Sequence, residues 1–294
     1  MGQSVDQALI TEFSDLVHQE AQQMTARMKP YVNLKQMEGD VFAYDGLGRV
    51  EARELQGRYN KTEFDDIEHS RRKIRRRRFV VTLPIDASDV RGALMNPDSE
   101  YSKACVNAMS RQTDRVISDA AFADVLSGRD FENTVTFADD GGLEVDATSG
   151  MTYDTLLEIH ENFINEDVGT EMDEKMFLTI TGKEHTQLMN ETELTSGDFT
   201  RQYAIEEGKI VKATGIDLLH YAANVPQPIF GNVGGERNLI AASSRGICMG
   251  ISKEMGITIV DRDDYVETSQ VQIVMEIGAV RTEGSLVQKV RVTA

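Results

Sequence analysis

The segment 39–86 most constrains what this chain can fold into, because it is too polar to build a core of its own. It ends in Arg71-Arg72-Lys73-Ile74-Arg75-Arg76-Arg77-Arg78, in which seven of eight residues are cationic. The whole chain has a formal charge of −18, so the remainder, without these seven cations, has −25. A dense positive run on a long polar segment needs a partner outside that segment. The complement we predict is another copy of the same chain.

The composition is that of a globular protein with one large core or two moderate ones. Of the 294 residues, 40% are hydrophobic and 27% are charged. Cys105 and Cys248 are isolated, so neither a disulfide framework nor a thiolate metal site is supported, and a reducing compartment is expected. No apolar stretch approaches the roughly 18–20 residues of a membrane span, and the N-terminus lacks the pattern of a secretion signal. We therefore expect synthesis in the cytoplasm and no membrane partner.

An amphipathic helix is predicted at the N-terminus. Ser4 is a suitable N-cap and Pro30 ends the helix, while apolar residues recur between them at spacings of three and four. Because the polar segment that follows offers little to pack on, this helix should lie on a distant surface or on a neighbour. The apolar stripe consists of Val5, Leu9, Phe13, Leu16, Val17, Ala21, Met24 and Met28.

A two-stranded ribbon is predicted within 39–86. Its first half is extended and rich in turns, with an alternating stretch at 50–53. Its second half contains Phe79, Val81, Leu83 and Ile85, whose strict period of two indicates a strand with one buried face. An isolated ribbon is marginal in water, so this one should lie across another surface. The charged tip between the strands contains Glu63, Asp65, Asp66 and Glu68.

A long helix and a closing hairpin are predicted on either side of a separate α/β unit. Asn96 and Pro97 open the helix, and Gly128 stops it after residue 127. Alternation over 271–277, a turn and a returning strand at 286–292 predict the hairpin, whose buried face would receive the helix.

The α/β unit begins with an amphipathic helix capped by Thr152. A strand at 176–180 and a short helix at 183–191 follow, and this alternation indicates a unit of its own. The glycine-bearing loop 231–235 is a candidate exposed tip. The predicted inner face of the first helix carries Tyr153, Leu156, Leu157, His160, Phe163 and Ile164.

The sequence contains no strong catalytic or metal-binding motif. None of the five histidines has the spacing of a zinc site, and the glycine patterns of phosphate-binding loops are missing. Glu184 and His185 are adjacent, but no serine or cysteine is placed to suggest a relay. Asp261, Asp263 and Asp264 resemble a divalent-cation cluster without the spacing of an EF-hand loop. We predict no catalytic residue, no metal and no cofactor.

Three interpretations of the basic run remain open. It can be a solvated strand, although such a dense run repels itself, or it can bind nucleic acid, although the net charge and the lack of interleaved aromatic residues oppose this. It can also pair with acidic surface on an adjacent subunit, which we favour. The predicted inter-subunit contacts are then Arg71, Arg72, Lys73, Arg75, Arg76, Arg77 and Arg78, with Glu63, Asp65, Asp66 and Glu68.

Four short motifs, in order along nearly the whole chain, carry a resemblance to a known family. They are Ile85-Asp86 with Asp89, the helix start Asn96-Pro97-Asp98-Ser99-Glu100-Tyr101, the helix positions Arg111, Asp114 and Ile117, and the strand Gly278-Ala279-Val280-Arg281. Together with the order of the elements, they resemble the major capsid proteins of tailed bacteriophages, whose fold is shared with encapsulins and the floor of herpesvirus capsids.

The resemblance implies an α+β capsid fold in four segments. These are an N-terminal arm at 1–38, an extension loop at 39–86, a peripheral domain at 87–150 and 262–294 with a spine helix at 97–127, and an axial domain at 151–261. The extension loop would lie over the neighbouring subunit. The axial tip, formed by Gly231, Asn232, Gly234 and Gly235, would meet its copies around five-fold and six-fold axes.

The implied function is self-assembly through pentamers and hexamers into an icosahedral shell around packaged double-stranded DNA. The main partner would be the chain itself, followed by scaffolding, portal and decoration proteins, with weak and non-specific contact to the DNA. The protein would be located in the virion capsid after assembly in the host cytoplasm.

Two rival functions remain open beside this one and the nucleic-acid binding already mentioned. An encapsulin-like nanocompartment would use the same fold to hold enzyme cargo instead of a genome. A soluble acidic enzyme with a lid at 39–86 would be a compact monomer or a small oligomer.

Overall fold

In the computed structural model, the described residues lie in nine stretches of the chain. The residues that carry most of the predicted arm helix and the acidic tip Glu63, Asp65, Asp66 and Glu68 lie outside them. Residues 22–28 are described and are not helical, so the arm helix does not continue to Pro30 as predicted. The described residues are 22–52, 54, 67, 69–86, 97–168, 174–191, 205–206, 209–262 and 268–294.

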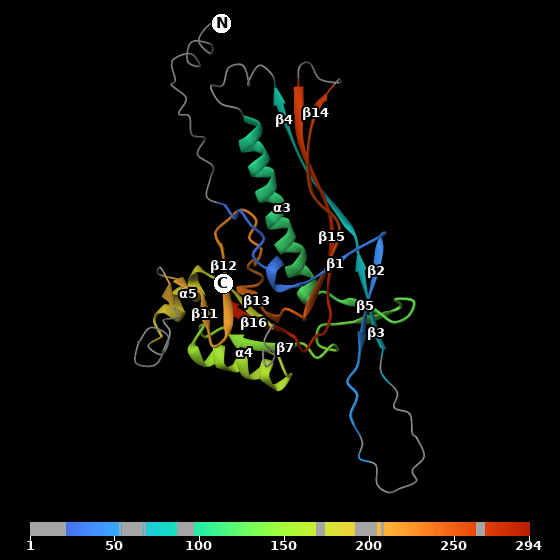
Figure 1. The fold of residues 1–294 in the computed structure, drawn as a ribbon. Coiled ribbons are helices and arrows are strands. Elements are labelled where there is room, and N and C mark those ends of the chain that lie inside the picture. Colours follow the sequence, from blue (N-terminus) through green and yellow to red (C-terminus); the bar gives the residue numbers. More distant parts are fainter. Residues whose placement is uncertain are drawn as a thin grey trace. The chain divides into compact units, whose positions relative to one another are not determined.

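The chain forms two compact units. The first comprises residues 1–26, 77–113 and 253–277, and the second comprises residues 27–76, 114–252 and 278–294. Three long elements run through both units: α3 (Pro97–Phe122), β14 (Ile247–Arg262) and β15 (Thr268–Arg281). Figure 1 shows these elements along the chain. The division into arm, extension loop, peripheral domain and axial domain stays a prediction.

The first unit is built on a sheet in which β15 lies between β14 and β4 (Arg77–Asp86). In β4, Phe79, Val81 and Leu83 are half-buried while Val80 and Thr82 are exposed, which confirms the predicted strand with one buried face. Its antiparallel partner is β15, however, and not the first strand of the ribbon. The helix α3 contacts β15 in this unit, where the Thr113 hydroxyl lies 3.5 Å from the Met275 sulfur.

The ribbon lies in the second unit and uses other strands than predicted. β2 (Val41–Leu47) pairs antiparallel with β3 (His69–Arg75), whereas residues 50–52 have no strand structure. These two strands belong to a four-stranded sheet with the order β2-β3-β5-β6, in which β5 is Val125–Ser127 and β6 is Asn133–Val135. β3 meets β5 at the pair Arg72 and Ser127, and the Gly128 amide donates a hydrogen bond to the Arg71 carbonyl at 3.1 Å. Beyond Arg71, the described residues of β2 and β3 form strand pairs only with each other.

A six-stranded sheet forms the largest part of the second unit. Its strand order is β11-β12-β8-β13-β16-β7, and every residue of the central strand β8 is buried. The predicted C-terminal hairpin is wrong, because β16 pairs with β13 and β7 instead of returning along β15. The strands are β11 (Lys212–Ala213), β12 (Ile216–Tyr221), β8 (Met176–Thr181), β13 (Glu236–Ser243), β16 (Val287–Thr293) and β7 (Leu143–Ala147).

Two helices accompany this sheet, α4 (Tyr153–Asn165) and α5 (Gly182–Met189). The Thr152 hydroxyl accepts a hydrogen bond from the Thr155 amide, which confirms the predicted N-cap of α4. The inner face of α4 is rotated relative to the prediction: its apolar core residues are Leu156, Ile159 and Phe163, while Leu157 and Ile164 are exposed. Two short elements precede the ribbon, η1 (Lys29–Tyr31) and β1 (Asn33–Gln36), and a small pair follows α5, β9 (Ile205–Glu206) and β10 (Lys209–Ile210).

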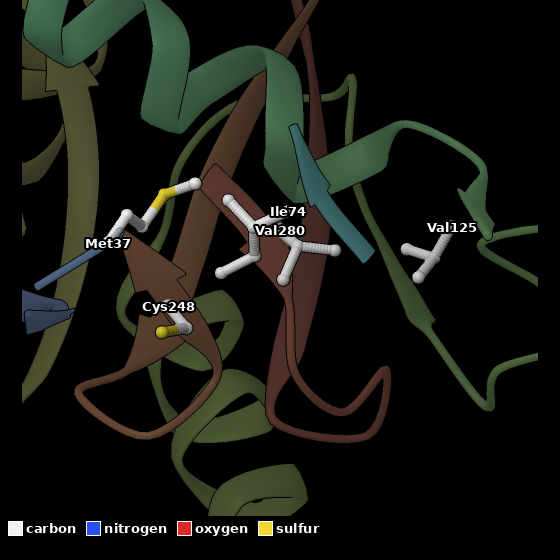
Figure 2. Close-up of a cluster of buried hydrophobic side chains, with 5 residues drawn as sticks. All are labelled: Met37, Ile74, Val125, Cys248 and Val280. Carbon is white, nitrogen blue, oxygen red and sulfur yellow. The ribbon is translucent and has the colours of Figure 1, made fainter. Parts of the chain in front are cut away.

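The root of the ribbon is packed into a small apolar cluster of the second unit. Figure 2 shows Ile74 of β3 beside Val280 of β15, with Met37, Cys248 and Val125 around them. Ile74 is the uncharged residue of the basic run, and it is fully buried. Burying a side chain of this size is worth about 1.5–3 kcal/mol. One apolar residue among seven cations therefore anchors this end of the ribbon.

We predict that Gly278→Ala lowers the stability of the subunit. A Cβ at position 278 would clash with the carbonyl oxygen of Arg75, so β15 and β3 would have to move apart. Overpacking of this kind costs about 1–3 kcal/mol. The measurement is urea unfolding of the unassembled subunit, followed by circular dichroism.

The matched control is Gly231→Ala, because nothing lies within 4 Å of a Cβ added there. It should change the free energy of unfolding by no more than about 0.5 kcal/mol. Equal effects of the two substitutions would contradict the close approach of β15 to β3.

Candidate functional site

The basic run Arg71–Arg78 is divided between two strands. Its first five residues belong to β3, Arg76 lies between the strands, and Arg77 and Arg78 begin β4. Because side chains alternate along a strand, Arg72 shares the face of the buried Ile74. The two flanking residues, Arg71 and Lys73, lie on the other face. The alternation therefore directs one arginine of the run toward the interior of its own chain.

Arg72 forms a buried ion cluster with Asp140 and Arg281. Its two terminal nitrogens lie 2.7 and 2.6 Å from the two carboxylate oxygens of Asp140, and the Arg281 Nε donates to the same carboxylate at 2.7 Å. The side chains of Arg72, Asp140 and Arg281 are 11%, 7% and 0% exposed. One carboxylate thus holds two guanidinium groups from distant parts of the sequence.

The second arginine of this cluster also completes the end of α3. Its Nη1 donates to the carbonyl oxygens of Ala121 and Ala123 at 2.9 and 3.0 Å. Carbonyls at a helix C-terminus have no partner within the helix, and a cation there is favoured by the helix dipole. The helix therefore ends at Phe122, where Arg281 meets it, and not at residue 127 as the sequence predicted.

The cluster sets the protonation state of Asp140. Burial alone would raise the pKa of this carboxyl, but the hydrogen bonds and charges of Arg72 and Arg281 outweigh burial and hold the pKa below its ordinary value. Asp140 therefore stays ionised at neutral pH. It offsets one of the two buried positive charges. Backbone carbonyls accept hydrogen bonds from other N–H groups of the two guanidiniums.

Most of the other cations of the run have partners within the chain. Arg71 pairs with its cross-strand neighbour Asp45 at 2.6 Å, with both side chains largely exposed, and this pairing lowers the pKa of Asp45. Arg78 lies 3.6 Å from Glu276 in the first unit. Three further contacts are Arg76 with Asp40, Lys73 over the ring of Phe131 and Arg77 over the ring of Phe79.

Arg75 differs from the rest of the run. It is exposed, and no described side chain forms an ion pair or a ring contact with it. The sequence predicts all seven cations to be available to a neighbour, but Arg72 has Asp140 as a partner and Arg281 beside it. No local pattern could have found these partners, since they lie 68 and 209 residues from Arg72.

A second buried carboxylate, Asp114, holds the chain at Arg27 and Met28, within the segment predicted as the N-terminal arm. It accepts hydrogen bonds from the backbone amides of Arg27 and Met28 at 2.9 and 3.1 Å, and from the Tyr221 hydroxyl at 2.9 Å. Burial and the nearby charge of Asp114 raise the pKa of Tyr221, so the phenol remains a donor. The backbone is thus fixed at Arg27 and Met28.

The predicted tip at 231–235 is an exposed two-residue turn. Val233 and Glu236 exchange backbone hydrogen bonds across Gly234 and Gly235, whose φ angles of 67° and 92° favour glycine. The Asn232 side chain accepts a hydrogen bond from the Gly235 amide at 2.9 Å. Val233 at the head of the turn is 75% exposed.

The described residues contain no group of three metal-ligating side chains. Asp263 and Asp264, in the acidic triplet noted in the sequence, lie outside them. Glu184 is buried, forms a capping box with Thr181 and lies 3.6 Å from Arg237, so its contacts are those of a structural residue. Burial raises the pKa of the Cys248 thiol to about 11. Among the described helices, none is long and apolar enough to span a membrane.

The comparison with protein families decides the identity of the chain. The family described as phage capsid protein matches residues 5–293. The chain belongs to the phage capsid protein family. No curated protein matches it closely enough to count as a relative.

Solved capsid structures share the fold of this capsid protein. The capsid of cyanophage P-SCSP1u aligns with a TM-score of 0.72 at 14% identity, covering 100% of this chain and 95% of that one. The structure titled Mycobacterium phage Che8 aligns with a TM-score of 0.68 at 13% identity, covering 95% and 96%. The head of Helicobacter pylori bacteriophage KHP40 aligns with a TM-score of 0.71 at 10% identity, covering 96% and 95%.

The chain is therefore a major capsid protein, a structural protein of an icosahedral bacteriophage shell. The mixed α and β fold agrees with the fold class expected from the sequence. Two of the motif residues that suggested the family, Asp114 and Arg281, lie at the buried contacts described above.

We predict that Asp140→Asn strongly destabilises the capsid subunit. The change leaves Arg72 and Arg281 buried without their counter-charge, and breaking a buried pair of this kind costs about 3–5 kcal/mol. Urea unfolding of the unassembled subunit measures the loss. Asp45→Asn, which removes the exposed partner of Arg71, is the matched control and should cost no more than about 1 kcal/mol. If Asp140→Asn lowered the free energy of unfolding as little as the control does, the cluster would contribute little to the stability of the subunit.

We also predict a specific acid-sensitivity. The pKa of Asp140 in the folded protein lies below the unfolded value of about 3.9. Its contribution to the free energy of unfolding is therefore complete above pH 3.9 and is lost as the pH falls through the folded pKa. Melting temperatures recorded from pH 7 to pH 3 should therefore fall more steeply below pH 4 for the wild type than for Asp140→Asn. Parallel curves would contradict a carboxylate stabilised by its two arginines.

Proposed function

We propose that this protein assembles through pentamers and hexamers into an icosahedral shell that encloses packaged double-stranded DNA. In this shell the ribbon formed by β2 and β3 lies over the neighbouring subunit. The observation that carries the proposal is the contrast along the ribbon. The root of the ribbon is fixed by the buried side chains of Ile74 and Arg72. At its outer end Leu47 is 71% exposed, and in the chain that follows Val50 is 54% exposed. Exposed apolar side chains on a marginal two-stranded element gain stability by contacting another surface.

The ion pairs within the chain limit which cations are available for this contact. Arg72 is committed to its own Asp140, and Arg71, Arg76 and Arg78 have acidic neighbours in the same chain. Arg75 is exposed and projects from the strand that also carries the buried Ile74. We therefore assign the main electrostatic contact with the neighbour's acidic surface to Arg75. The acids Glu63, Asp65, Asp66 and Glu68 remain proposed contacts on the same loop.

The turn at 231–235 is the proposed axial tip. Its exposed Val233 and its glycines allow close approach of several copies around a symmetry axis. A surplus of acid elsewhere on the chain, with a net charge of −18, limits the contact with packaged DNA to weak and non-specific binding. Scaffolding, portal and decoration proteins are further proposed partners, and assembly is proposed to take place in the host cytoplasm.

The test is imaging of particles formed by the purified chain, combined with analysis of their content. Negative-stain microscopy should show discrete shells, and particles from infected cells should release double-stranded DNA after denaturation. A monomer or small oligomer at high concentration would contradict shell assembly. Particles that release an enzyme instead of nucleic acid would point to an encapsulin-like compartment.

We predict that Arg75→Glu lowers the yield of shells while the subunit stays folded. The substitution replaces a cation that faces a neighbour's acids with a like charge, and like charges at a contact oppose association. Light scattering measures assembly, and circular dichroism checks the fold.

Arg129→Glu is the matched control, because Arg129 is also exposed and undergoes the same change of charge outside the ribbon. Assembly of both variants at the wild-type yield would refute the proposed role of Arg75.

A further inference from the structure

Two histidines of the second unit hold a single residue of β10 between them. The Ile210 amide donates a hydrogen bond to His185 Nε2 at 3.4 Å, and His220 Nε2 lies 2.9 Å from the Ile210 carbonyl oxygen. His185 belongs to α5 and His220 to β12, and α5 contacts both β10 and β12. The Ile210 side chain is fully buried. Side chains from two elements therefore bind both polar backbone groups of one residue.

The chemistry of these two hydrogen bonds fixes the hydrogen on each ring. A carbonyl oxygen only accepts, so His220 Nε2 carries a hydrogen and donates it. A backbone amide only donates, so His185 Nε2 carries none, and the neutral His185 ring has its hydrogen on Nδ1. Protonation of His185 therefore removes an acceptor, whereas protonation of His220 leaves its donor in place. His185 is the residue of the pair that senses pH.

The contact between the two rings adds a second reason for a response to acid. The ring centroids of His185 and His220 lie 5.0 Å apart with an interplanar angle of 70°, which is an edge-to-face contact. Two imidazolium ions at this distance repel each other. Both histidines are half-buried, so protons from the solvent can reach them.

The charged side chains of α5 have contacts of their own. Lys183 donates to the backbone oxygens of Thr293 and Ala294 at 3.0 and 3.2 Å. The buried Glu184 accepts from the Thr181 amide and lies 3.6 Å from Arg237, and Glu191 is the next acid along the chain. Within the described residues, no carboxylate is bonded to His185. A positive charge on its ring is therefore not offset by a described acid.

On β12, the charged neighbours of the histidine pair are Asp217 and Arg27. Asp217 lies 3.7 Å from Lys212 of β11, and the Arg27 guanidinium donates to the His220 carbonyl oxygen. Arg27 adds a further positive charge beside the pair, which disfavours protonation of the histidines in this arrangement. The charged residues of the β9–β10 pair are Glu206 and Lys209, whose side chains lie outside the described residues.

We propose that His185 and His220 form a pH-sensitive clasp on Ile210, which holds β10 on α5 and β12 while His185 is neutral and releases it when His185 is protonated. The clasp lies within one subunit, so the proposal does not rest on shell assembly. An ordinary imidazole has a pKa of about 6.5. The clasp is therefore closed in neutral solution and opens as the pH falls below that value.

Amide hydrogen exchange at Ile210, followed by NMR on the unassembled subunit, tests the clasp. Exchange is expressed relative to the intrinsic rate at each pH, so that only the protection by structure is compared. Because the open form takes up one proton, the protection of the Ile210 amide should fall about tenfold between pH 7.5 and pH 5.5. Leu178 in the buried strand β8 reports global unfolding and should keep its protection. Equal protection of Ile210 at the two pH values, or a parallel fall at Leu178, overturns the clasp.

Substitution of the sensing residue shows whether His185 causes the response. Glutamine retains an oxygen acceptor and gains no proton in this range of pH. His185→Gln should therefore keep Ile210 protected at pH 7.5 and abolish the fall at pH 5.5. The matched control is His160→Gln, because His160 is also a half-buried histidine of this unit and lies on α4. It should retain the wild-type fall. A tenfold fall in His185→Gln, or its loss in His160→Gln, overturns the assignment.

The tautomers of the two rings provide a test that needs no variant. In NMR spectra of the subunit with ¹⁵N-labelled histidine at pH 7.5, His185 should carry its hydrogen on Nδ1 and His220 on Nε2. A hydrogen on Nε2 of His185 overturns the clasp, even if His185→Gln disturbs the packing around β10. Each of these measurements is made on single subunits, so their failure leaves the proposed shell function intact.

Discussion

One buried carboxylate, Asp140, connects the parts of the chain on which the shell function depends. It holds Arg72 at the root of the ribbon and Arg281 at the end of β15, and through Arg281 it reaches the last carbonyls of α3. Desolvating three charged groups is costly, and the short hydrogen bonds among them offset that cost only in one arrangement. The point and direction at which the ribbon leaves the body are therefore fixed inside each subunit.

A second buried carboxylate of the same unit is used in a similar way. Asp114 holds the backbone amides of Arg27 and Met28, as Asp140 holds the ribbon through Arg72. In both places a buried acid holds donors from a distant part of the sequence, and along the ribbon Leu47 is 71% exposed. This arrangement suits a protein whose copies must present the same extensions in the same geometry many times. Rigid roots reduce the entropy that is lost when a neighbour binds an extension.

Some local patterns in the sequence predicted local structure correctly, others such as the inner face of α4 did not, and long-range partners could not be predicted. The period of two in β4 and the Thr152 cap of α4 depend on neighbouring residues, and both are confirmed. The end of α3 and the pairing of β16 were wrong because they depend on Arg281 and on β13, which lie far away in sequence. For the same reason the sequence predicts a basic run that is free for a neighbour, whereas Arg72 is bonded to Asp140 within the chain. The motif residues indicated the family, but they did not indicate what Asp114 and Arg281 hold.

The most direct test of this account is a cryo-electron microscopy map of assembled shells that resolves side chains. The account predicts that Arg72 remains bonded to Asp140 of its own subunit throughout the shell, while the outer ribbon around Leu47 contacts a neighbouring subunit. A map in which Arg72 is bonded to an acid of the neighbour, or in which the ribbon touches only its own subunit, would contradict it.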